Sequence, residues 1–124
     1  MHEYGHVLLE DETQVDLTVG RDTHDPAGFV EGAFRRAFYD AFWRELGVSG
    51  AGDYDRSPTH YVSRYGANYF HEDIADTFAV FVLGGEPGKN TVAEEKLRFF
   101  WRDPDMTALR SAVRENLGLE WPKR

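Results

Sequence analysis

The stretch His2-Glu3-Tyr4-Gly5-His6, near the start of the 124-residue chain, has the pattern H-E-x-x-H. In an α-helix with 3.6 residues per turn, residues four apart project from the same face, one turn apart. His2 and His6 would therefore lie side by side, and two neutral imidazoles in this arrangement can hold one Zn²⁺ ion. The five residues thus predict a helix and, on one face of it, half of a metal site.

The residue between the two histidines gives the pattern its chemical meaning. In zinc metallopeptidases, H-E-x-x-H supplies two metal ligands and a glutamate that acts as general base. Glu3 would lie beside His2 but rotated around the helix axis, so that it reaches past the metal. There it can take a proton from a zinc-bound water and pass it to the leaving amine. The alternative is a chance match, so the rest of the chain must decide.

Composition limits the possible partners and ligands. Hydrophobic residues make up 41% of the chain and aromatic residues 15%, which is typical of a globular domain. The net charge of −8 argues against nucleic acid as a partner. The absence of cysteine leaves His, Asp and Glu as metal ligands. No apolar run is long enough for a membrane span, and the sequence carries no indication of an oligomeric state.

The position of the motif predicts a truncated domain. A metal-binding helix ordinarily follows a turn and a cap, because its first four N–H groups lack partners, yet His2 is the second residue. We therefore expect residues 1–124 to form a single domain that is the C-terminal part of a longer catalytic domain. Any signal peptide, strand or cleft wall that precedes it would lie outside this sequence.

Periodic apolar residues and capping signals predict a mainly α fold with four to five helices and little or no β-strand. Asp25-Pro26, the capping box Thr91-x-x-Glu94, and Asp103-Pro104 mark helix starts. Helices are expected over residues 3–10, 26–46, 69–83, 91–101 and 104–117, a short strand over 15–19, and loops over 20–26 and 47–60.

Burial and exposure are predicted from the same patterns. The stripe from Phe29 to Leu46 is expected to pack in the core, and Leu117 to face inward from the last helix. Arg35 is expected to face water or a partner. His24 and His60 are expected in exposed loops, and His71 as a bystander that contributes at most to substrate binding, because these three lack a ligand partner at a useful spacing.

A second motif lies on the helix predicted over residues 69–83. Glu72 and Asp76 are four residues apart and share one helix face. Glu72 is the candidate third ligand, since two histidines and one carboxylate leave the fourth zinc position for water. Asp76 would accept the outer N–H of a ligating histidine and fix its tautomer. The alternative is an ordinary acidic helix face.

Together, the two motifs resemble gluzincin metallopeptidases of the anthrax lethal factor type, and still more the putative zinc-binding extracellular peptidases related to it. That family has H-E-[FY]-G-H, then Tyr-[Gly or Ala], five residues, and Glu-x-x-Ala-[Glu or Asp]-x-Phe. Here the second motif begins at Tyr65-Gly66 and continues from Glu72 to Phe78. The resemblance implies a zincin-like fold with His2, His6 and Glu72 as zinc ligands.

The resemblance also implies that Glu3 is the general base and Tyr65 the oxyanion stabiliser, a role for which a phenol O–H is suited. Asp76 departs from the more frequent Glu but keeps a carboxylate. The implied activity is zinc-dependent hydrolysis of peptide or protein substrates, and the implied parent protein is extracellular.

Two other functions remain open. The chain can be an inactive zincin-like fragment that acts as a protein-interaction module, because no substrate-binding strand precedes the metal helix. It can also carry a structural zinc site, although such sites usually close the fourth position with protein ligands, often Cys.

Overall fold

The computed structural model describes residues 1–45, 58–63 and 65–118. Over these ranges the protein is mainly α-helical and has no sheet, which confirms the predicted fold class. The α-helices are α1 (His2–Leu9), α2 (Phe34–Phe42), α3 (Phe70–Leu83), α4 (Val92–Trp101) and α5 (Pro104–Asn116). Short 3-10 helices span Pro26–Gly28, Pro58–His60 and Tyr65–Ala67.

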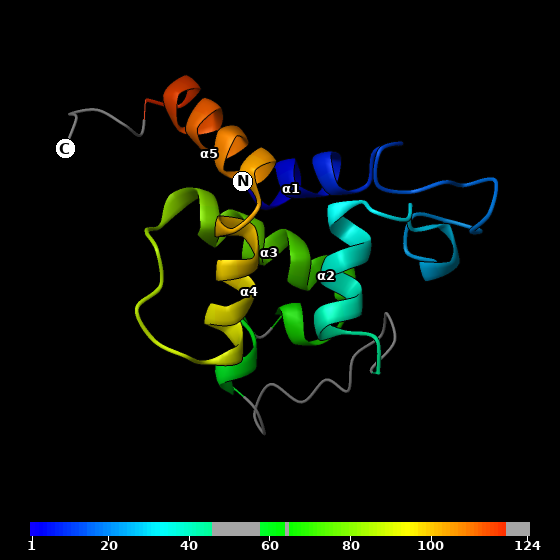
Figure 1. The fold of residues 1–124 in the computed structure, drawn as a ribbon, viewed down its shortest axis with the longest axis horizontal. Coiled ribbons are helices and arrows are strands. Elements are labelled where there is room, and N and C mark those ends of the chain that lie inside the picture. The colour runs from blue at the N-terminus through cyan, green and yellow to red at the C-terminus, as the bar shows by residue number, and fades with distance from the viewer. Residues whose placement is uncertain (46–57, 64, 119–124) are drawn as a thin grey trace.

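Helix α3 is the centre of the fold and contacts each of the other four α-helices. In Figure 1 it lies in the middle, with α4 on its left and α2 on its right, while α1 and α5 lie along the upper edge. Most of its apolar residues are fully buried, among them Phe70, Ile74 and Phe78, whereas Val80 and Leu83 near its end are exposed. The bounds of α3 lie within one residue of those that the apolar pattern predicted.

Aromatic rings fill the space between α2, α3 and α4. The Phe38 ring from α2 lies 6.1 Å from the ring of Phe70 on α3 and 5.8 Å from that of Phe100 on α4. All three side chains are fully buried, as is Trp43, which follows α2 directly. Burial of a large aromatic side chain contributes roughly 1.5–3 kcal/mol, so this cluster fixes the three helices relative to one another.

A glycine allows α1 to approach α3 closely. A Cβ atom on Gly5 would lie 3.1 Å from Cδ2 of Phe78 and 3.3 Å from the Cα of Ala75. Both distances are shorter than ordinary van der Waals contact. The second x of H-E-x-x-H therefore faces α3, and its lack of a side chain brings the motif against the helix that carries Glu72.

The helix predicted over residues 26–46 is wrong in its first half. Asp25 does cap a helical turn, accepting a hydrogen bond from the Ala27 N–H, but this turn ends after Gly28. Phe29 instead pairs with Val15 in an isolated antiparallel bridge. Gly32 then takes a positive φ of 83°, which an α-helix does not allow, so α2 begins only at Phe34.

The strand predicted over residues 15–19 is also wrong, because only Val15 pairs and a turn follows. The Asp16 side chain accepts hydrogen bonds from the Thr18 N–H and hydroxyl, which favours a turn over extended backbone. Most of the loop predicted over residues 47–60 lies outside the described residues.

The predictions of exposure for Arg35 and of burial for Leu117 are wrong as well. Arg35 is fully buried, where its guanidinium donates to the backbone oxygens of Leu9 and Thr23. Burial lowers its pKa to about 10, against the opposing effect of Glu10. Arg35 therefore ties the end of α1 to α2. Leu117, expected in the core, is 55% exposed just beyond α5.

The later helix starts agree with the sequence. Thr91 and Glu94 form the reciprocal capping box of α4, and the Asp103 side chain accepts two backbone hydrogen bonds at the start of α5. Across the described ranges, none of these helices combines the length and apolar character needed to cross a membrane.

Candidate metal centre

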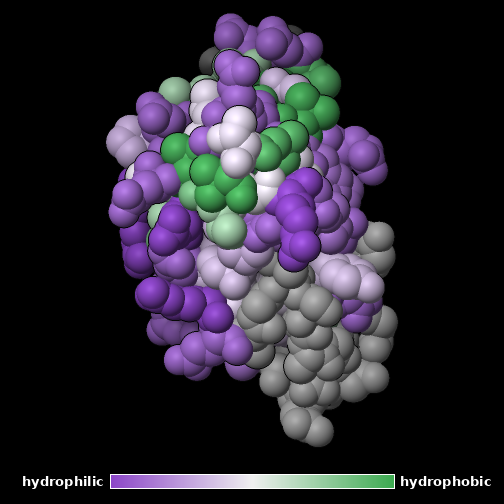
Figure 2. All heavy atoms as spheres, turned by 90° about the vertical axis from the view of Figure 1, so that its right-hand side faces the viewer, coloured by the Kyte–Doolittle hydropathy of each residue, from purple (hydrophilic) through white to green (hydrophobic). Residues whose placement is uncertain are grey.

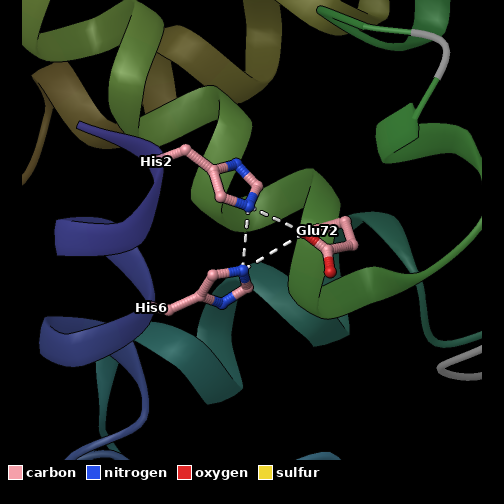
Figure 3. Close-up of side chains that lie close together, drawn as sticks. All are labelled: His2, His6 and Glu72. Carbon is pink, nitrogen blue, oxygen red and sulfur yellow. Dashed lines mark hydrogen bonds and ion pairs between the residues drawn. The ribbon is translucent and has the colours of Figure 1, made fainter.

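Three side chains from two helices converge at the contact between α1 and α3. His2 and His6 lie one turn apart on α1, and Glu72 extends from the first turn of α3 (Figure 3). The Nε2 atoms of the two histidines are 2.9 Å apart. Oε1 of Glu72 lies 2.8 Å from Nε2 of His2 and 3.2 Å from Nε2 of His6. The structure thus brings together the three residues that were predicted from the sequence as metal ligands.

The two histidines point their outer nitrogens at carboxylates. Nδ1 of His2 contacts Oδ1 of Asp76, one turn beyond Glu72 on α3. Nδ1 of His6 lies 2.7 Å from Oε2 of Glu10, one turn further along α1. An ionised carboxylate can only accept hydrogen bonds, so each Nδ1 can donate its proton to its carboxylate, which would leave the Nε2 lone pair of each histidine to a metal ion.

The donor set suits one zinc ion. Two imidazole nitrogens and a carboxylate oxygen lie close together, and zinc binds atoms of these types at about 2.0–2.2 Å. Tetrahedral geometry at such lengths would place the donor atoms roughly 3.3 Å from one another. The observed separations of 2.8 to 3.2 Å are close to this value. Three protein ligands leave a fourth position for water or substrate.

Hydrogen bonds beyond the ligands hold the His2 side of the site. Oδ2 of Asp76 accepts a hydrogen bond from the hydroxyl of Ser63. The Ser63 oxygen in turn accepts one from the Gly66 N–H at 2.9 Å. A chain of contacts therefore runs from the segment before α3 through Asp76 to His2, and it fixes both the tautomer and the orientation of this ring.

The electrostatic environment keeps Glu72 ionised. Burial alone would raise the pKa of its carboxyl, but the nearby His6, His71 and His2 outweigh it, and the pKa is lowered from the ordinary value. The side chains of the three candidate ligands remain 11 to 26% exposed. A small ion can therefore reach them from solvent.

Glu3 and Tyr65 are the two residues expected to act on the substrate. Glu3 is exposed on α1 beside His2, and its side chain has no hydrogen bond or ion pair with the described residues. The backbone of Tyr65 opens the short 3-10 helix that precedes and contacts α3. The side chain of Tyr65 lies outside what the structure describes, so its expected role stays a prediction.

Two histidines that the sequence analysis set aside belong to the surroundings of the site. Nε2 of His71 lies 3.2 Å from Oε2 of Glu72, so its ring contacts a candidate ligand. His24 is half-buried and stacks on His71, with ring centroids 3.7 Å apart and planes inclined by 12°. Burial and His24 lower the pKa of His71, against the opposing effect of Glu72. His60 is exposed, as predicted.

Sequence reasoning missed further supporting residues for different reasons. Glu10 follows His6 by four residues, so the same helical spacing that linked His2 to His6 would have found it. Ser63 lies just before the second motif, and nothing in its spacing indicates a contact with Asp76. His24 comes from a loop, and its contact with His71 depends on the path of that loop.

The residue after Glu72, Asp73, forms a buried ion pair with Lys96. Oδ2 of Asp73 is 2.8 Å from Nζ of Lys96 on α4 and accepts a 2.8 Å hydrogen bond from the Trp43 indole. Lys96 also donates to the backbone oxygen of His60 at 2.7 Å. Burial raises the pKa of Asp73, opposed by Lys96 and Trp43, and burial lowers that of Lys96, opposed by Asp73.

No family model matches the chain, and neither a curated protein nor a solved structure matches it. The arguments for the site therefore come from the two sequence motifs and from the geometry of the residues around them.

Proposed function

We propose that this chain carries the catalytic helices of a zinc-dependent peptidase, with His2, His6 and Glu72 as the metal ligands. The observation that supports this most is the convergence of the three donor atoms within 3.2 Å, with the outer nitrogens of both histidines on carboxylates. An acidic patch without a metal function does not require this fixed tautomer on two neighbouring rings.

A zinc ion held here would polarise a scissile carbonyl and lower the pKa of a water molecule. Glu3 is the proposed general base, because its exposed carboxylate lies next to His2 and is not engaged by other described side chains. It would accept the proton of the attacking water and then protonate the departing amine nitrogen. The resemblance assigns Tyr65 to stabilise the oxyanion by hydrogen bonding.

The proposed substrate is a peptide or protein, and the parent protein is proposed to be extracellular, both on the basis of the resemblance. The chain's charge of −8 favours capture of a metal cation and disfavours nucleic acid.

The first test is the zinc content of the protein by elemental mass spectrometry, beside His6→Ala and Glu72→Ala variants. About one zinc per chain, lost in both variants, is expected from a three-ligand site. A chain that binds no zinc even after zinc is added back would contradict the proposal.

The second test is hydrolysis of a peptide library by the zinc-loaded protein and by Glu3→Gln. Glu3→Gln should keep zinc and lose turnover, because the amide is not a base. Loss of zinc from this variant would contradict the assigned role of Glu3. A wild-type chain that holds zinc but cleaves nothing would instead support the interaction module.

A further inference from the structure

The two oxygens of Glu72 face different partners. Oε1 is directed at the Nε2 atoms of His2 and His6, at 2.8 and 3.2 Å. Oε2 lies 3.2 Å from Nε2 of His71, which comes from the same helix but is not one of the candidate ligands. A carboxylate whose oxygens are divided in this way can offer one oxygen to a metal while the other is engaged elsewhere.

The imidazole of His71 is itself held in place by ring contacts. His24 stacks on it at 3.7 Å between ring centroids, nearly parallel. The Tyr69 ring lies 5.6 Å away at an interplanar angle of 28°. The His71 side chain is 17% exposed, so neighbouring rings restrict its rotation. The loop that carries His24 is therefore connected, through His71, to the carboxylate of Glu72.

The environment of the second ring nitrogen of His71, Nδ1, is consistent with a ring whose Nε2 faces Glu72. Nδ1 of His71 is buried and has no hydrogen-bond partner among the described residues. Among the described residues, the one ion pair of this ring is with Oε2 of Glu72, on the Nε2 side. The ring is thus oriented by stacking on one element and by the Glu72 carboxylate on the other.

We propose that His71 is a positioning residue that keeps Oε2 of Glu72 away from the metal, so that Glu72 binds through Oε1 alone, and that His24 holds His71 in place. This inference rests on the proposed function and deepens it. A carboxylate bound through both oxygens would use an additional coordination position. By preventing this, His71 would preserve the open position that a water molecule needs.

The test compares wild type with His71→Phe, His71→Gln and His24→Ala. Phe keeps a flat ring for stacking but removes both nitrogens, and Gln keeps an N–H donor. Zinc affinity is measured by competition with a chromophoric chelator, and the coordination number is read from the visible absorption of the cobalt(II)-substituted protein. Circular dichroism and denaturant unfolding of the metal-free proteins show whether each variant folds.

His71→Phe should bind zinc about 10- to 100-fold more weakly, as is typical when an outer partner of a metal ligand is removed. Its cobalt spectrum should change from the intense bands of a four-coordinate ion toward the weaker bands of a higher coordination number. His71→Gln should recover most of the affinity and the wild-type spectrum. His24→Ala should lose a few-fold in affinity in the same direction.

The outcomes separate the two proposals. A wild-type chain that binds neither zinc nor cobalt overturns the metal site and, with it, the role of His71. A wild type that binds both metals, beside a His71→Phe variant with an unchanged spectrum, overturns the role of His71 alone. This second conclusion holds even if affinity and stability fall together, because a structural role would not alter coordination number.

Discussion

Glu72 and Asp73 are neighbours in sequence and on the same helix, but their carboxylates have opposite environments. Glu72 faces the imidazoles of α1, is partly accessible, and has a lowered pKa. Asp73 has no solvent exposure, contacts Lys96 and Trp43, and has a pKa raised by burial. A rotation of about 100° around the helix axis separates the two positions.

The comparison distinguishes a carboxylate whose surroundings suit the proposed metal site from one that connects helices. The interactions of Glu72 favour the ionised form that a metal binds, and they come from residues that solvent can reach. Asp73 is surrounded by groups that link α3 to α4 and to the segment after α2. Substitution of Glu72 is therefore expected to weaken metal binding with little effect on the free energy of unfolding. Substitution around Asp73 is expected to lower the free energy of unfolding with little direct effect on metal binding.

The largest expected effect is on the free energy of unfolding, when the ion pair of Asp73 with Lys96 is broken. Lys96→Met would leave the carboxylate of Asp73 buried without its cation, and the free energy of unfolding should fall by about 3–5 kcal/mol. Urea denaturation of the metal-free protein measures this. The matched control is the double variant Lys96→Met with Asp73→Asn, which removes both charges and should recover much of the loss. An equal loss in both proteins would contradict the ion-pair explanation.

The second prediction concerns Glu72→Ala. Zinc affinity should fall by more than the roughly 10- to 100-fold expected for an outer partner, because a ligand itself is lost. The free energy of unfolding without metal should change by only about 1 kcal/mol. Thermal unfolding with and without zinc checks both points, since zinc should raise the midpoint of the wild type and not that of the variant. Substantial unfolding of Glu72→Ala would remove the contrast with Asp73.

The third prediction concerns Asp76, which contacts the outer nitrogen of His2. Asp76→Ala should weaken zinc binding about 10- to 100-fold. Asp76→Asn should cost less, because the amide oxygen can still accept the Nδ1–H of His2. Chelator competition measures both affinities. Equal losses in the two variants would indicate that charge, and not tautomer control, is the contribution of Asp76.

The smallest expected effect comes from Gly5→Ala. The new methyl group would press against Phe78 and the backbone of Ala75, and the helix-favouring effect of alanine would offset part of this strain. A net loss of about 1 kcal/mol is expected, with weaker zinc binding because α1 moves away from Glu72. Gly85→Ala, where a Cβ meets nothing within 4 Å, is the control. No difference between the two would contradict the close approach of α1 and α3.

Much of the fold could be predicted where local signals were strong. The helix over 70–83 has a continuous apolar pattern, and the capping residues Thr91 and Asp103 mark helix starts by hydrogen bonds within a few residues. The prediction was wrong for the first half of the helix over 26–46, because the apolar residues there lie in a short turn and an isolated bridge and reach the core without a helix. Apolar periodicity alone does not distinguish a helix from an irregular segment with the same spacing. Gly32, which has a positive φ, was the local signal against a continuous helix.

By itself, the sequence determined which residues are candidate ligands. The spacing of His2 and His6 and that of Glu72 and Asp76 each place two groups on one helix face, because a helix repeats every 3.6 residues. Only the tertiary structure decided that the two faces meet, because that depends on how closely α1 approaches α3 at Gly5. It also decided the stacking of His24 on His71 and the burial of Arg35, since both bring together residues far apart in the chain.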